Sequence, residues 1–316
     1  MENILFSKFS CKRAFGIELE VGNEIPLSCI RDTIKDNSFV PVKTAFYRAS
    51  LNNAYWDVKH DGSCGKHIDK YGINEGGYEV CSYKAVHLND LFHICNIAKT
   101  LKGRGCKVNP NCGLHIHIDA SDFSIEQMGM LIGAWCCIED TVLQVAHPSR
   151  RKNKYCGRFI NSRAGLPDEA TPSNLWNFYK PKSTKLHDNY DRRLTLNLVN
   201  YFRHLNLKKF RRPTIEFRFP EGTLDAVVIK NWVRLFINFV NRMSVQTNSI
   251  QQIRSYNLED TLKTLGLMAE KNEFLILSPG LHETKKWFLK RIMKFADIYH
   301  NDLAFKAEEI LLGMEK

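Results

Sequence analysis

The stretch RAFGIELEV, residues 13–21, alternates strictly between side chains of two kinds. Apolar Phe15, Ile17, Leu19 and Val21 fall on one side of an extended chain, and Gly16, Glu18 and Glu20 fall on the other. Because successive side chains of a strand point to opposite faces, the pattern predicts a half-buried strand. Residues two apart lie about 7 Å from each other on one face, so Glu18 and Glu20 present two carboxylates to the same side.

The same alternation returns in LHIHID (114–119) and in TIEFRF (214–219), and more weakly around Glu79 in GGYEVCS. If the apolar faces of these strands pack on helices, the opposite face of the sheet collects Glu18, Glu20, Glu79, His115, His117, Glu216 and Arg218. An ordinary exposed sheet face would be richer in Thr, Ser and Lys. Several carboxylates with an imidazole suit Mg²⁺ or Mn²⁺ better than Zn²⁺, so the pattern predicts a magnesium site on the sheet.

Two other interpretations concern CxxHxH, formed by Cys112, His115 and His117. These side chains are all able to bind zinc, but the spacing matches no common zinc finger and no second Cys/His pair supports it. A Cys112 nucleophile paired with a histidine is also conceivable, although proximity in sequence is no evidence for such a pair. We favour a packed, inert thiol.

Helical periodicity marks residues 84–102, 125–146, 226–243 and a long amphipathic stretch at about 283–313. Ser124 and Gln127 suit a capping box, and Asp225 suits an N-cap. Strands and helices do not alternate in βαβ units, which predicts an α+β fold with an antiparallel sheet backed by helices. With no repeat or linker, we expect a main domain over 1–245 and a helical appendage over 246–316.

The composition is that of a folded globular chain: 316 residues, 44% hydrophobic and 25% charged. The formal charge of +11 favours anionic partners, which include nucleotide phosphates, nucleic acid and acidic substrates. No signal peptide opens the sequence and no stretch approaches the roughly 18 apolar residues of a membrane span. The ten cysteines show no CxxC pairs, so we expect reduced thiols, a cytoplasmic location and no membrane partner.

The segment SRRKNKYCGRFINSR, residues 149–163, is the most basic part of the chain. Its arginines and lysines lie among Tyr155 and Phe159, a mixture typical of nucleic-acid binding. A loop that closes on phosphate or substrate is the interpretation we favour. A third interpretation is a run of charged side chains that is simply exposed to solvent.

Five motifs in order carry a resemblance: FGIELE (15–20), HDGS (60–63), GGYEVCS (76–82), CGLHIHID (112–119), and TIEFRFPEGTLDA followed by IKNWV (214–233). They resemble the successive motifs of the amidoligase family, the carboxylate–amine ligases related to glutamine synthetase and glutamate–cysteine ligase. The resemblance covers roughly residues 13 to 243. It implies a curved antiparallel sheet, as in a glutamine-synthetase-like catalytic domain, with ATP and divalent ions on its concave face.

The resemblance also implies roles for single residues. The metal ligands would be Glu18, Glu20, Glu79, His115 and Glu216. Nucleotide or substrate would meet His117 and the turn of Asp61 and Ser63, and Arg218 would meet phosphate. The family has an arginine- and tyrosine-bearing loop where this chain has Arg150 and Arg151.

The family also places an Arg and an Asn before its ExR strand. This chain offers Arg192 with Asn197, and Arg203 with Asn206. We prefer the first pair, because LNLVN follows it, but the insertion before Thr214 leaves the choice open.

The expected activity is an ATP- and Mg²⁺-dependent (or Mn²⁺-dependent) ligation of a small-molecule or peptide carboxylate to an amine through an acyl phosphate. One alternative is a phosphotransferase that uses the same metal site without an amine step. Another is a nucleic-acid-binding protein that uses residues 149–163; nucleic acid is a partner we do not favour.

Overall fold

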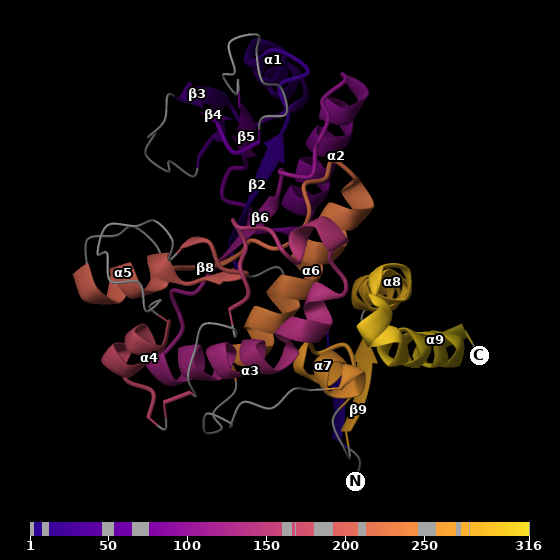
Figure 1. Ribbon diagram of the computed structural model, residues 1–316. Helices are drawn as coiled ribbons and strands as arrows, with labels where there is room; N and C mark the ends of the chain where they lie inside the picture. Colours follow the sequence, from indigo (N-terminus) through magenta and orange to yellow (C-terminus); the bar gives the residue numbers. More distant parts are fainter. Residues whose placement is uncertain are drawn as a thin grey trace. The chain divides into compact units, whose positions relative to one another are not determined.

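The computed structural model describes residues 3–7, 13–45, 54–64, 76–159, 166–167, 169–179, 192–207, 213–245, 257–269, 273–277 and 279–315 (Figure 1). The chain divides into two compact units, and each is described by itself. We call residues 11–118 and 217–233 the sheet unit. Residues 1–10, 119–216 and 234–316 form the helix-rich unit.

The sheet unit is built on strands in the order β3-β4-β5-β2-β6. Their bounds are β2 (Phe15–Val21), β3 (Val42–Ala45), β4 (Trp56–Asp61), β5 (Gly77–Cys81) and β6 (Leu114–Asp119). β2 pairs antiparallel with β5 and β6, and β5 pairs antiparallel with β4. The pairings of β2, β4, β5 and β6 are antiparallel, as predicted, and β3 joins the edge parallel to β4, which makes the sheet mixed there. The short segment VKTA has no alternation that would have revealed this pairing.

The apolar face of this sheet is buried, as the alternation predicts. Ile17, Leu19, Val80, Leu114 and Ile116 are at most 1% exposed. Helix α1 (Leu27–Asn37) contacts α2 (Leu88–Gly103), β3 and β4. The α+β class with helices backing the sheet is therefore confirmed.

The helix-rich unit contains most of the described helices. Its elements are β1 (Asn3–Ser7), α3 (Ile125–Leu143), the 3-10 turn η1 (Pro148–Arg150), α4 (Pro172–Tyr179), β7 (Leu196–Asn197), α5 (Val199–Leu207), β8 (Thr214–Phe217), α6 (Ala226–Met243), α7 (Leu258–Thr264), β9 (Glu273–Leu277), α8 (Pro279–Phe295), η4 (Ile298–His300) and α9 (Asn301–Glu315). β8 and α6 each cross the boundary between the units, after Glu216 and after Val233. β1 pairs parallel with β9, and β7 neighbours β8.

Local sequence signals explain several helix ends. Ser124 and Gln127 form the predicted capping box at the start of α3. The Asp225 carboxylate accepts from the backbone N–H groups of Val227 and Val228 at the start of α6, as an N-cap does. These caps satisfy backbone donors that the first helical turn leaves without a partner.

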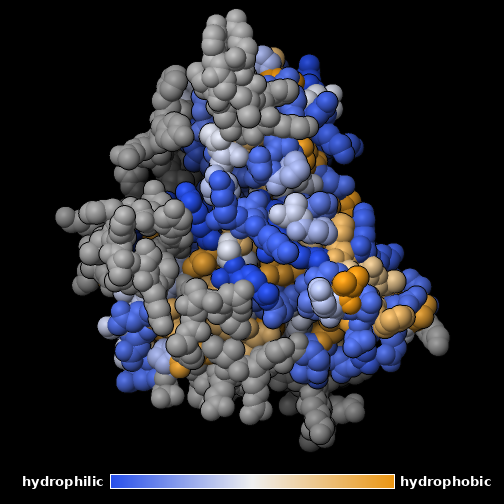
Figure 2. Space-filling model, viewed as in Figure 1, coloured by the Kyte–Doolittle hydropathy of each residue, from blue (hydrophilic) through white to orange (hydrophobic). Residues whose placement is uncertain are grey.

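The prediction of one long helix over 283–313 is wrong, because α8 ends at Phe295 and α9 begins at Asn301. Between them Asp297 caps the short turn η4 by accepting from the backbone N–H of Tyr299. α8 and α9 pack against each other, and Figure 2 shows hydrophobic surface among hydrophilic residues over both. Among the described residues, no helix is both long enough and apolar enough to cross a membrane.

The predicted domain boundary at residue 245 does not coincide with a boundary between the two units. The C-terminal helices α8 and α9 share a unit with residues 119–216. A division into a main domain over 1–245 and an appendage over 246–316 stays a prediction.

Candidate functional site

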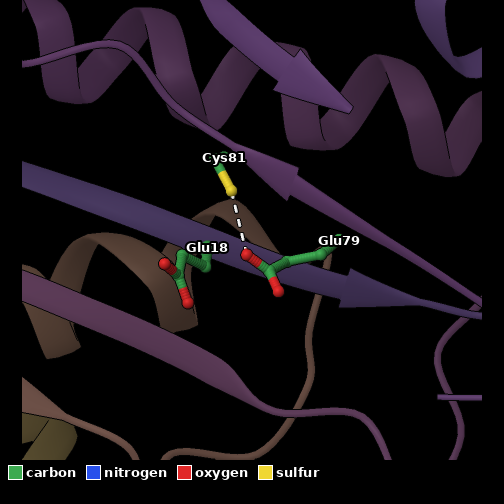
Figure 3. Close-up of side chains that lie close together, drawn as sticks. All are labelled: Glu18, Glu79 and Cys81. Carbon is green, nitrogen blue, oxygen red and sulfur yellow. Dashed lines mark hydrogen bonds between the residues drawn. The ribbon is translucent and has the colours of Figure 1, made fainter. Parts of the chain in front are cut away.

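Strand pairing brings the acidic side chains of the sheet unit onto one face. Glu18 lies opposite His115 on β6 and opposite Cys81 on β5, and Glu20 lies opposite Glu79. The carboxylates of Glu18 and Glu79 approach each other on this face (Figure 3), and one ligand atom from each lies within 4.8 Å of the Cys81 sulfur. These residues therefore lie together on one face of the sheet, and their role as metal ligands stays a prediction.

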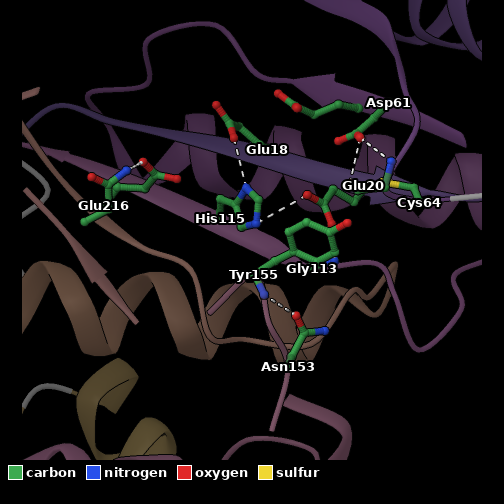
Figure 4. A network of polar contacts seen from close by, with 12 residues as sticks. Glu18, Glu20, Asp61, Cys64, Gly113, His115, Asn153, Tyr155 and Glu216 are labelled. Carbon is green, nitrogen blue, oxygen red and sulfur yellow. Dashed lines mark hydrogen bonds and ion pairs between the residues drawn. The ribbon is translucent and has the colours of Figure 1, made fainter. Parts of the chain in front are cut away.

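His115 lies between two of the carboxylates (Figure 4). Its Nδ1 is 3.0 Å from Glu18 Oε2, and its Nε2 is 3.4 Å from Glu20 Oε1. A neutral imidazole has one N–H, so it donates to one carboxylate and turns a lone pair toward the other. A cation shared by that nitrogen and that carboxylate would remove the conflict, so the donor set fits a metal ion.

His117, which follows on the same strand, contacts the same glutamate from another side. Its Nε2 is 3.0 Å from Glu18 Oε1. Burial alone would raise the pKa of Glu18, but the charge of His117 and hydrogen bonds from His115 and His117 together hold that pKa well below its ordinary value. Glu18 is therefore ionised at neutral pH and available to a cation.

Glu79 behaves in the opposite way. Burial, followed by repulsion from Glu18, raises the pKa of Glu79 to about 7. The carboxylate already has two partners, because Lys59 Nζ lies 2.8 Å from its Oε1 and the Cys81 thiol donates to the same oxygen at 2.9 Å. Within the described part of the sheet unit, the ammonium of Lys59 is thus the positive charge in direct contact with the Glu79 carboxylate.

Lys59 was missed by the sequence analysis. β4 alternates like the other strands: Trp56 and Val58 are buried, and Asp57, Lys59 and Asp61 point to the other face. Lys59 lies opposite Glu79 in the strand register. If HDGS had been treated as the end of a strand, Lys59 would have been placed on the acidic face. Burial would lower the pKa of Lys59, but Cys81, Glu79 and Glu18 raise it, so the side chain stays charged.

The HDGS motif forms a turn at the end of β4. The Asp61 carboxylate accepts from the Ser63 backbone N–H at 2.8 Å and from the Ser63 hydroxyl at 2.7 Å. Ligand atoms of Glu20, Asp61 and Cys64 lie within 4.8 Å of one another, so the turn belongs to the edge of the acidic face (Figure 4). The Glu20 carboxylate also accepts from the Gly113 N–H.

Arg218 lies in the sheet unit, directly after β8, and is half-buried. The chain beyond it runs beside the start of β6: Leu114 N–H donates to Pro220 O at 3.1 Å, and Gly222 N–H donates to Cys112 O at 2.9 Å. The ExR motif thus continues as a strand-like segment past β8.

Two other predicted residues meet within the helix-rich unit. Glu216 is buried on β8, and the Asn197 amide donates to its carboxylate. The Tyr179 hydroxyl donates to Asn197 Oδ1 at 3.3 Å and fixes the direction of that amide. This contact supports the choice of Asn197 as the asparagine of the motif, whereas Arg192 of the same stretch is exposed.

The basic segment is less exposed than its composition suggests. Arg150 is 1% exposed. Arg151 donates to the backbone carbonyls of Leu143 and Phe295 and lies 3.4 Å from the Asp297 carboxylate. These contacts tie the end of α3 to the end of α8, and the end of the segment, including Arg163, lies outside the described residues. Catalytic roles for Arg150 and Arg151 remain predictions.

The sequence matches one family along most of its length. The model of a family described as "putative amidoligase enzyme" matches residues 11–240. No curated protein matches the sequence.

The solved structures that this chain is similar to are distant. A bifunctional glutathione synthetase from Pasteurella multocida is 12% identical over 97% of this chain and 52% of that chain, with a TM-score of 0.46. A glutamine synthase homologue is 14% identical over 94% and 70% of the two chains, with a TM-score of 0.36. A chain in the complex of the ubiquitin-like protein Pup and its ligase PafA is 9% identical over 96% and 70%, with a TM-score of 0.32. This chain spans about half of the glutathione synthetase, and similarities this low carry no argument about activity.

Proposed function

This chain belongs to the family of putative amidoligase enzymes, and from that premise we propose that it is an ATP-dependent carboxylate–amine ligase. It would join a small-molecule or peptide carboxylate to an amine through an acyl phosphate. The observation that carries the proposal is the meeting of Glu18, Glu20, Glu79 and His115 on one sheet face. A cytoplasmic location is part of the same proposal.

These four residues would hold Mg²⁺ or Mn²⁺, since three of them are carboxylates and both ions prefer hard oxygen ligands. Glu216 is a further predicted ligand. An ion held by these residues would supply positive charge that offsets the negative charge of the ATP phosphates during phosphoryl transfer. The low pKa of Glu18 supports this role, because the ligand must be ionised when the cation arrives.

The remaining residues would orient the reactants. His117 and the Asp61–Ser63 turn lie on or beside the acidic face and would contact nucleotide or substrate. Arg218, and on the sequence prediction Arg192, would stabilise charge on the transferred phosphoryl group. Asn197 would keep the Glu216 carboxylate in one orientation through its amide.

A carboxylate does not condense with an amine in water, because it lacks a good leaving group. Transfer of the γ-phosphoryl group to the carboxylate supplies one: a P–O bond of ATP breaks, and a new P–O bond to the carboxylate forms. The amine nitrogen then attacks the acyl carbon, loses a proton and expels phosphate. Exclusion of water from the site would protect the acyl phosphate from hydrolysis.

The test is ADP release from the full chain with Mg²⁺, measured with pooled amino acids, peptides and polyamines, with and without the amines. Ligation predicts ADP release that needs both a carboxylate and an amine, together with a product whose mass equals their sum minus water. ADP release that needs no amine and yields a phosphorylated product would assign a phosphotransferase instead. No Mg²⁺-dependent ADP release from any pool would contradict the proposal.

A further inference from the structure

Two buried cysteines meet at the edge of the acidic face. Cys64 ends the turn that follows β4, and Cys112 precedes β6, 48 positions later in the chain. Their thiols hydrogen-bond to each other, with Cys64 as the donor. The Cys112 sulfur also accepts from the Asn109 backbone N–H at 3.4 Å. The proposed ligand set requires neither thiol.

The surrounding backbone holds these sulfurs together. Asn109 links both turns, because its Nδ2 donates to Cys64 O at 2.7 Å and its carbonyl accepts from the Cys112 N–H at 3.0 Å. Glycines pack behind both cysteines: a Cβ on Gly77 would lie 2.7 Å from Cys64 Cβ, and one on Gly222 would lie 2.5 Å from Cys112 Cβ. Since Cβ atoms do not approach this closely, any larger residue at either position would push a cysteine out of place.

We infer that Cys64 and Cys112 are a redox modification site, whose reversible disulfide weakens metal binding by the neighbouring carboxylates. The thiols are buried, so the oxidant must be small, and hydrogen peroxide is of the right class. One thiolate attacks peroxide, which gives a sulfenic acid and a hydroxide ion that takes up the proton lost by the thiol to form water. The second sulfur attacks the sulfenic sulfur, forms the S–S bond and releases a second water. Two thiols are oxidised and one peroxide is reduced.

The consequence for the metal follows from the neighbours of each cysteine. A disulfide brings the sulfurs to about 2 Å, so both turns must be drawn together. Cys112 is followed by Gly113, whose N–H holds the Glu20 carboxylate. Cys64 is preceded by Ser63, whose N–H and hydroxyl hold Asp61. Only this weakening of metal binding rests on the proposed function.

The experiment treats the full chain with hydrogen peroxide, maps peptides under non-reducing conditions and measures Mn²⁺ affinity before oxidation, after oxidation and after dithiothreitol. We expect a cross-linked pair of peptides that contain Cys64 and Cys112, at the mass of their sum less two hydrogens. The Mn²⁺ dissociation constant should rise on the order of tenfold, as when a group that orients a ligand is lost, and dithiothreitol should restore it. Neither readout needs ligase activity, so a failure of this inference can be told apart from a failure of the ligase assay.

Single cysteine variants distinguish the effect of the Cys64–Cys112 disulfide from the effect of oxidation elsewhere in the chain. Cys64→Ser and Cys112→Ser should keep their Mn²⁺ affinity in peroxide, and Cys95→Ser should still respond like the parent. Cys95 is a matched control because it is also buried, with its thiol bonded to Ala226 O. Peroxide that oxidises the exposed Cys29 but leaves the pair reduced would overturn the inference, and this result on the parent chain decides even if a variant fails to fold. A disulfide that leaves Mn²⁺ affinity unchanged would also overturn it.

Discussion

The acidic face of the sheet unit and the basic segment at 149–163 are both dense in charge, but their charges are used differently. On the acidic face, Glu18 and Glu79 are brought together with one ammonium, that of Lys59, bonded to Glu79. In the basic segment, Arg150 is buried and Arg151 spreads its donors over backbone carbonyls. Carboxylates concentrated on one face repel one another and therefore favour a bound cation, whereas arginines that already donate to backbone carbonyls support structure. The comparison thus favours the acidic face as the site of chemistry.

The largest effect should come from removing one charge of the acidic face. Glu18→Gln keeps the shape of the side chain but loses the anion that contacts His115 and His117. We expect Mg²⁺-dependent ADP formation to fall at least about 100-fold, because a bound metal contributes several kcal/mol to charge stabilisation in the transition state. The measurement is ADP release across a Mg²⁺ titration. Glu24 is an exposed glutamate three residues past β2, and the Glu24→Gln variant should release ADP at the rate of the parent. Equal rates for the parent, Glu18→Gln and Glu24→Gln would contradict the metal assignment.

The second effect concerns stability in the basic segment. Arg151→Ala removes hydrogen bonds from a charged donor to three carbonyls and a carboxylate, so we expect a loss of about 2–4 kcal/mol in the free energy of unfolding. The melting temperature should fall by about 5 °C or more, while turnover per folded molecule is kept. The exposed Lys152, changed to Ala, should leave both unchanged. A loss of turnover at an unchanged melting temperature would instead support the catalytic prediction for Arg151.

The third effect is a pH dependence that belongs to the acidic face. As a proposed metal ligand, Glu79 must be ionised, and its pKa is raised to about 7, so Mn²⁺ affinity should fall about tenfold for each pH unit below that value. Glu79→Gln should bind Mn²⁺ more weakly and with a flatter pH profile. Without metal the sign for stability is the reverse: the folded chain binds more protons than the unfolded one between about pH 4.5 and 7, so the contribution of Glu79 decreases as pH rises through this window. Calorimetric titrations at several pH values measure the first effect, and a parent profile as flat as that of the variant would contradict it.

The smallest effect should follow from removing the internal cation. Lys59→Met leaves Glu79 without its ammonium partner at 2.8 Å, so a metal no longer competes with it. An interaction of about 1 kcal/mol between a partly exposed pair corresponds to a roughly fivefold gain in Mn²⁺ affinity for the ionised site. Because Lys59 also lowers the pKa of Glu79, the affinities of the two chains are compared at the high-pH plateau of each pH profile, where Glu79 is ionised. Lys43→Met on β3, where the side chain is exposed, is the matched control. Weaker Mn²⁺ binding by Lys59→Met would mean that the ammonium positions Glu79 rather than competing with the metal.

The sequence predicted best where side-chain direction is set locally. Alternation fixes which way Glu18 and His115 point, because the period of a strand is two, and both appear where expected. The same rule would have found Lys59 if residues 56–61 had been treated as a strand. The paired thiols of Cys64 and Cys112 were beyond prediction, since they depend on which strand lies beside which.

The basic segment was the harder case for the same reason. Arg151 binds Phe295, which lies far along the chain, and no local pattern encodes that contact. The break between α8 and α9 did leave a local signal, because Asp297 is a good capping residue, but amphipathic periodicity continues across it. The parallel edge pairing of β3 likewise depends on a long-range choice of partner.

The most direct test of the ligase assignment follows the oxygen atoms of the carboxylate. The full chain is incubated with MgATP, an amine pool, and a pool of amino acids and peptides whose carboxylates carry oxygen-18, and the released phosphate is analysed by mass spectrometry. An acyl phosphate route leaves one carboxylate oxygen on phosphorus when the amine attacks, so the account predicts phosphate that carries a single oxygen-18 and appears together with the amide. Unlabelled phosphate from a reaction that does release ADP would show that the carboxylate is never phosphorylated, and it would contradict the account.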